Sequence, residues 1–137
     1  MSALTEIQKK LADAGLGTYD TTVRRGRMPA QPDVMCIVQA YPGPEPEMGF
    51  GTPGISYETV AFQVLVRGVA DDLDGPLARA QTAYVELAKV EATTLTGGGT
   101  SAFYHHIAPR PPFELKRDSD GRVYVAVNAL AEKGLSA

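Results

Sequence analysis

The stretch Tyr57-Glu-Thr-Val-Ala-Phe-Gln-Val-Leu-Val-Arg67 is the clearest β-strand signal in the sequence. Its residues alternate with a period of two, which in an extended chain places successive side chains on opposite faces of a sheet. One face is entirely apolar and consists of Val60, Phe62, Val64 and Val66. The other face is mixed and consists of Thr59, Ala61, Gln63, Leu65 and Arg67. The stretch therefore predicts a strand.

Four other segments also indicate strands. Residues 34–41 are too apolar to have one face in water, which is typical of a central strand. Residues 101–108 are rich in β-prone types, and residues 123–128 alternate after an Asp-Ser-Asp-Gly turn at 118–121. Residues 21–23 precede several arginines and predict a short edge strand whose charges discourage further pairing.

Two segments have the apolar spacing of helices. Leu4, Ile7 and Leu11 predict an amphipathic helix over residues 3–14 that ends at Gly15. Pro76 suits a first helical position, and apolar residues at helical spacing follow it, so a second helix is expected over about residues 76–92.

The order of these elements is helix, strands, helix, strands. Because the strands follow one another instead of alternating with helices, the sequence predicts an α+β fold. We expect a mostly antiparallel sheet of four to five strands with two helices packed on one face. The opposite face would then be in water or covered by a partner. The chain, 1–137, is expected to be a single domain, since its length suits one core.

Composition excludes some classes of function. The chain has 137 residues and a net charge of −3, so it lacks the basic surface that duplex binding requires. No stretch is long and apolar enough to span a bilayer, and the N-terminal residues predict no export signal. The single cysteine, Cys36, lies in an apolar run and is expected to be a buried, inert thiol, which suits a reducing cytoplasm.

Several short motifs resemble functional sites but lack essential parts. The glycine-rich residues 49–54 precede a strand where a dinucleotide site needs a helix, and residues 97–100 lack the lysine of a phosphate loop. Residues 118–121 start like a calcium loop, but the later ligands are missing. His105 and His106 are adjacent, so on a regular strand they would point to opposite faces. No catalytic set, cofactor site or metal site is therefore predicted.

Two features suggest contact with partners. Residues 42–56 hold too many prolines and glycines for regular structure, and so long a loop is often functional. Arg24, Arg25 and Arg27 form the densest basic cluster, which can pair with carboxylates or guard a strand edge.

The whole pattern resembles the tail terminator proteins of long-tailed phages, a family also labelled minor capsid protein. The resemblance rests on the order of weak motifs along nearly the entire chain. These motifs are the N-terminal helix with Gly15, Met28-Pro29 and Pro32-Asp33 before the strand ending at Tyr41-Pro42-Gly43, the strand Phe62–Gly68, the helix through Ala80, Tyr84 and Leu87, and the closing Asp118–Arg122 and Val127-Asn128. The stretch Pro109–Arg117 departs from the family pattern.

The resemblance implies a structural virion protein and no enzyme. Such a subunit forms a six-membered ring on the tail tube, stops its polymerisation and meets the head connector or stopper protein. DNA passes through the lumen without specific binding, and neither a cofactor nor a membrane is involved. The protein would be assembled in the host cytoplasm and lie at the tail-neck junction.

Nine residues are predicted to contact a neighbouring subunit or the tail tube. Among them the basic cluster would pair with an acidic patch that includes Asp71, Asp72 and Asp74 on the next subunit. The predicted contact residues are Arg24, Arg25, Arg27, Met48, Phe50, Asp71, Asp72, Asp118 and Arg122.

Two alternatives remain open. The protein could be another neck or tail-tube component of the particle, because such proteins share a small α+β build. It could also be a small metal-dependent α+β enzyme that uses Asp118, Asp120 and His106 around a cation.

Overall fold

The computed structural model describes residues 2–40 and 57–134. Its helical elements are α1 (Ser2–Leu11), the π-helical turn η1 (Ala12–Leu16) and α2 (Asp74–Ala88). Its strands are β1 (Val23–Arg25), β2 (Met35–Ala40), β3 (Tyr57–Ala70), β4 (Glu91–Gly97), β5 (Thr100–Pro109), β6 (Phe113–Arg117) and β7 (Arg122–Gly134).

All seven described strands belong to one sheet. Its order is β1-β2-β3-β7-β5-β4, and β6 also pairs with β7. Strands β1 and β2 are parallel, and every other pair is antiparallel. One edge of β7 pairs with β3 along almost its whole length, whereas its other edge is divided between β6 and β5. Strand β7 therefore pairs with three other strands and joins the two halves of the sheet.

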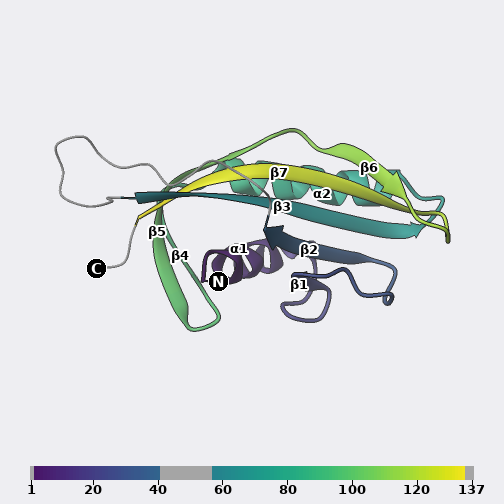
Figure 1. Ribbon diagram of the computed structural model, residues 1–137, viewed down its shortest axis with the longest axis horizontal. Helices are drawn as coiled ribbons and strands as arrows, with labels where there is room; N and C mark the ends of the chain where they lie inside the picture. Colours follow the sequence, from purple (N-terminus) through teal and green to yellow (C-terminus); the bar gives the residue numbers. More distant parts are fainter. Residues whose placement is uncertain (1, 41–56, 135–137) are drawn as a thin grey trace.

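The sheet is curled into a half-barrel, and 51% of the structure is strand. Helix α1 lies inside the curl, where it contacts β1 and β2 on one side and β4 and β5 on the other, while α2 packs on β3, β7 and β5 (Figure 1). The predicted sheet of four to five strands with two helices on one face is therefore wrong. The sheet has more strands, and its curvature wraps around a helix instead of presenting a flat layer.

The two strands that the sequence did not indicate, β4 and β6, are mostly exposed. In β4 only Leu95 and Gly97 are buried, and in β6 all five residues are exposed. Such strands bury too few side chains to produce the apolar alternation that identifies a strand. Their backbone hydrogen bonds to β5 and β7 form them instead.

The main core lies on one side of the sheet, which we call the inner face. The alternating residues Phe62, Val64 and Val66 of β3 are fully buried there, as predicted from the sequence. Leu4, Ile7 and Leu11 of α1 pack into the same core, so the predicted amphipathic helix is confirmed. The helix leaves regular α-geometry after Leu11, and Gly15 has the positive φ of 90° that suits a glycine at a helix end.

The only cysteine, Cys36, also belongs to the inner core and is fully buried. Burial raises the pKa of its thiol to about 12, although the charge of Arg79 acts in the opposite direction. Because the thiolate is the reactive form, this cysteine is unreactive at neutral pH. The expectation of a buried, inert thiol is confirmed.

Candidate functional site

The opposite side of the sheet, which we call the outer face, carries the mixed residues of the alternating strands. Gln63, Leu65 and Arg67 of β3 lie there beside residues of β2 and β7 with which they are in register. A second, smaller apolar cluster forms on this face around Leu65. Its buried members are Met35, Ile37, Leu65, Tyr124 and Ala126, with Met28 packed against them.

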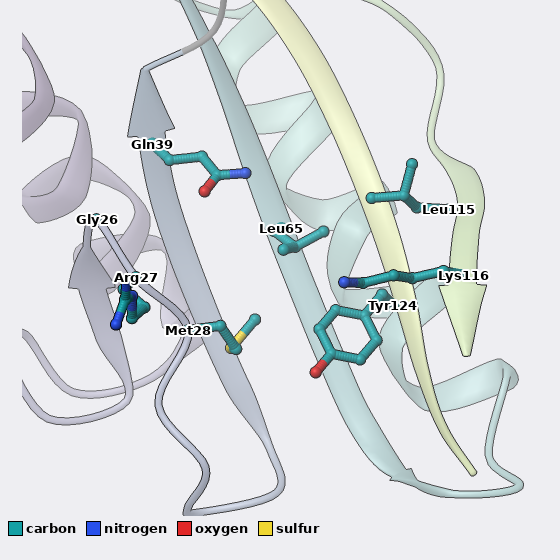
Figure 2. Close-up of a pocket in the computed structure, with 8 residues that line it drawn as sticks. All are labelled: Gly26, Arg27, Met28, Gln39, Leu65, Leu115, Lys116 and Tyr124. Atoms are coloured by element: carbon teal, nitrogen blue, oxygen red, sulfur yellow. The ribbon is translucent and has the colours of Figure 1, made fainter. Parts of the chain in front are cut away.

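A shallow groove of about 600 Å³ is hollowed in this face. Apolar side chains of Met28, Leu65 and Leu115 and the ring of Tyr124 form much of its lining, as Figure 2 shows. The Lys116 Nζ atom lies 4.8 Å from the centroid of the Tyr124 ring, within the range of a cation–π contact. The remaining lining residues are Gly26, Arg27 and Gln39. The groove thus combines apolar side chains with polar ones, two of which are cationic.

The two cations at the groove, Arg27 and Lys116, bring positive charge to this apolar surface. Among the residues that the structure describes, no carboxylate lies within ion-pair distance of either side chain. Because a positive charge beside apolar surface attracts carboxylates and disfavours other cations, the groove suits an acidic partner with some apolar surface.

Three side-chain amides cross the outer face next to the groove. Gln39 Nε2 donates to Gln63 Oε1 at 2.7 Å, and Gln63 Nε2 donates to Asn128 Oδ1 at 2.8 Å. The two bonds link β2, β3 and β7 and satisfy the buried amide of Gln63. Gln39 and Asn128, at the two ends, are only partly buried and keep hydrogen-bonding capacity toward solvent or a partner.

Arg67 holds the segment before β2 against the end of the outer face. Its side chain is 1% exposed, and its guanidinium donates to the carbonyl oxygens of Pro29 at 2.8 Å, Pro32 at 2.6 Å and Asp33 at 2.8 Å. Sequence reasoning placed Arg67 on the mixed face but missed this role. The available signal was a charged residue at the end of an otherwise apolar strand, together with a proline-rich segment that lacks secondary structure.

Asp118 and Arg122, both predicted to lie at an interface, pair with each other. Arg122 Nε donates to Asp118 Oδ2 at 2.8 Å, and Arg122 Nη1 donates to the carbonyl oxygen of Ala30 at 2.6 Å. The predicted turn between them is confirmed, because the Gly121 N–H donates to the Asp118 carbonyl. A contact of these residues with a neighbour stays a prediction.

The pKa of Asp118 is lowered from its ordinary value. Desolvation opposes ionisation and is the largest single influence, but it is outweighed by hydrogen bonds to the carboxylate. The backbone N–H and side chain of Arg122 and the hydroxyl of Tyr124 donate these bonds. The carboxylate is thus held ionised as part of the turn.

The predicted basic cluster is divided between the two faces of β1. Arg24 is in register with Ile37, so it lies on the outer face, whereas Arg25 is in register with Val38 and lies on the inner side. Arg27 lines the groove. All three side chains are exposed.

The predicted acidic patch lies between β3 and α2. Asp71 is exposed. Asp72 is half-buried, and its Oδ1 accepts a hydrogen bond from the Gly75 N–H at 3.1 Å. Among the described residues, no ion pair joins this patch to the basic cluster. The predicted pairing between these groups therefore concerns two molecules and stays a prediction.

Two other predicted contact residues, Met48 and Phe50, lie outside the described residues, as does the predicted loop over residues 42–56. Within residues 2–40 and 57–134, no three side chains of metal-binding type come together. His106 instead lies 3.7 Å from Glu132, and His105 makes an edge-to-face contact with Phe103. None of the helices described here is long and apolar enough to cross a membrane.

Comparison with known proteins gives one informative match. The model of the family described as bacteriophage tail terminator protein matches residues 10–133. No curated protein sequence matches the chain. A solved structure is 15% identical to this chain and matches 96% of this chain and 93% of its own, with a TM-score of 0.48.

The family match covers most of the chain and agrees with the resemblance drawn from the sequence motifs. Proteins of this description are structural components of the virion tail. The chain therefore belongs to the bacteriophage tail terminator protein family.

Proposed function

We propose that the protein forms a closed ring of six copies that sits on the end of the tail tube, stops its polymerisation and joins the tail to the head connector or stopper protein. The observation that carries this proposal is the family match over residues 10–133. Such a ring acts only by binding neighbouring proteins through complementary surfaces, so its function requires no catalytic residue and no cofactor.

The charges of the subunit are compatible with a ring. In a closed ring every subunit uses two different surfaces, one for each neighbour. Among the described residues, Arg27 and Lys116 on the outer face and Asp71 and Asp74 at the start of α2 take part in no ion pair. Opposite charges on separate surfaces favour contact between two copies over contact within one.

The net charge also bears on what passes through the ring. Each copy carries −3, so six copies carry about −18, which disfavours tight binding of DNA. We therefore propose that DNA passes through the lumen without specific recognition. The ring would be assembled in the host cytoplasm and would lie in the virion between tail tube and head.

The test is electron microscopy of particles assembled without this gene product, with tail length and head attachment recorded. Overlong or ragged tails without heads are expected, because nothing would then stop the tube or join it to the head. Tails of normal length without heads would instead indicate another neck component. Tails of normal length joined to heads would overturn the proposal, and the wild-type gene supplied separately is the control.

A further inference from the structure

Helix α2 buries one of its sides, and another side carries exposed apolar residues among polar ones. Pro76, Ala80, Ala83 and Leu87 face the core. Asp74, Leu77, Gln81 and Val85 follow a spacing of i, i+3, i+7 and i+11, which places them together on another side of the helix. The side chains of Leu77 and Val85 are 38% and 40% exposed. We call these four residues the α2 stripe.

The N-terminal end of the α2 stripe is acidic. Asp74 is in the first turn of the helix, and Asp71 precedes it, and both side chains are exposed. In the described parts of the chain neither carboxylate takes part in an ion pair. The stripe thus carries two exposed apolar side chains, Leu77 and Val85, with Gln81 between them, and it ends in unpaired negative charge.

The outer-face groove has the complementary properties. Its lining includes Met28, Leu65 and Leu115, and Arg27 and Lys116 bring positive charge to it. The groove and helix α2 lie on opposite sides of the sheet, as the view of the lining residues in front of the helix shows (Figure 2). The groove of a subunit therefore cannot receive the stripe of the same subunit.

We propose that the outer-face groove of one copy binds the α2 stripe of the next copy, with Asp74 beside Arg27 and Lys116. This inference rests on the proposed ring, since it names the two surfaces that would meet there. We take a second copy of this chain as the partner because of charge complementarity. The chain itself carries a surface, the α2 stripe, whose acidic and apolar residues match the cationic and apolar residues of the groove. Each copy would keep one groove and one stripe for its two neighbours, so the contact is head-to-tail and can close into a ring.

The first test is cross-linking with a short bismaleimide, on purified protein and on purified particles. The variant that carries both Arg27→Cys and Asp74→Cys is expected to give a ladder of linked subunits. It is measured at a protein concentration about tenfold above that at which the wild type assembles, because the substitutions remove two charges of the contact. A mixture of the two single variants is expected to stop at linked dimers. The wild-type chain is the background control, because Cys36 is fully buried and its neutral thiol does not react.

The geometry of the contact is tested by two further variants. Arg25→Cys combined with Asp74→Cys should link poorly, because Arg25 lies on the other side of β1. Linking of Arg27→Cys to itself would show a symmetric contact and overturn the head-to-tail assignment. Equal linking through Arg25→Cys and Arg27→Cys would overturn the groove as the site.

The second test is a charge-reversal cycle measured by native mass spectrometry over a range of protein concentrations. Arg27→Glu and Asp74→Lys should each raise the concentration needed for assembly about tenfold or more, and the combination should recover most of the loss. Arg25→Glu and Glu91→Lys, both exposed and outside the proposed contact, are the matched controls. Thermal melts of all five variants, the combination included, check that folding is intact.

The outcomes separate this inference from the proposed function. If wild-type rings form and the reversals of Arg27 and Asp74 leave them unchanged, the assignment of the two surfaces is wrong while the ring stands. If the protein is absent from the particles and tails form normally without it, the proposed function is wrong. Lost assembly in both single variants without recovery in their combination would also overturn the pairing.

Discussion

The two faces of the sheet are built on different principles. The inner face buries an almost purely apolar set of strand residues, including Phe62, Val64 and Val125, against the helices. The outer face buries polar residues of the strands themselves, among them Gln63 and Arg67, each with hydrogen-bond partners. The polar side chains buried on the inner side come mainly from α1, where Glu6 accepts a hydrogen bond from the Tyr104 hydroxyl and Gln8 donates to the Val23 carbonyl. Apolar burial supplies most of the free energy of folding, whereas satisfied polar networks fix one arrangement. The inner face should therefore determine stability, and the outer face should determine the shape presented to partners.

The largest effect is expected from a substitution on the inner face. Phe62→Ala removes a fully buried ring and leaves a cavity, so the free energy of unfolding should fall by about 3–5 kcal/mol. Urea unfolding measures the change. Val69→Ala, at an exposed position of β3 that belongs neither to the groove nor to the α2 stripe, is the control and should change the value by no more than about 0.5 kcal/mol. A loss in Phe62→Ala as small as in the control would contradict the division between the faces.

A smaller effect is expected from Arg67→Met on the outer face. The variant keeps a long side chain but loses the charged donors to the carbonyls of residues 29–33, so a loss of about 2–3 kcal/mol is expected. Amide hydrogen exchange should speed up most around this segment and β2. The exposed Arg110→Met is the matched control. Uniformly faster exchange across the inner-face strands would show that Arg67 supports the whole fold instead of one segment.

The smallest effect is expected from Asp118→Asn, and it depends on pH. The folded state lowers the pKa of Asp118 below its ordinary value of 3.8, so the ionised carboxylate stabilises the protein above that pH. This stability is lost as pH falls through the lowered pKa. The wild-type chain should therefore exceed the variant in unfolding free energy at neutral pH, and the difference should shrink below about pH 4. If the difference in unfolding free energy stayed constant from neutral to acidic pH, the loss in Asp118→Asn would come from altered packing or hydrogen-bond geometry and not from the lost charge.

Sequence patterns identified the inner face much better than the outer one. The strand at residues 57–67 was predicted from the apolar residues at every second position, and these residues face the inner core. The observed strand β3 starts at the same residue and is three residues longer, since it ends at Ala70. The helix expected over 76–92 is observed over Asp74–Ala88, and the residues from Glu91 onward form β4 instead. Strand β6 was missed because its five residues are all exposed, and the prediction of a sheet of four to five strands with two helices packed on one face was wrong.

The candidate site was predicted less completely for a related reason. The basic cluster and the acidic patch were visible as local runs of charge. The groove was not, because its lining comes from β2, β3, β6, β7 and the segment after β1, which are far apart in the sequence. The network around Arg67 likewise joins residues more than thirty positions apart, and no local spacing indicates such a contact.

The position of β7 in the sheet has a consequence for how the subunit is made. It is the last strand in chain order, yet it alone connects the β1-β2-β3 part of the sheet to the β4-β5 hairpin and to β6. A nascent chain that lacks it holds two separate strand groups whose edges would pair with it. Folding must then wait for synthesis of nearly the whole described chain, and long-range pairing of this kind is slow. Premature termination before Arg122 should therefore give fragments that aggregate or are degraded, and no partly built subunit would be available to enter an assembly.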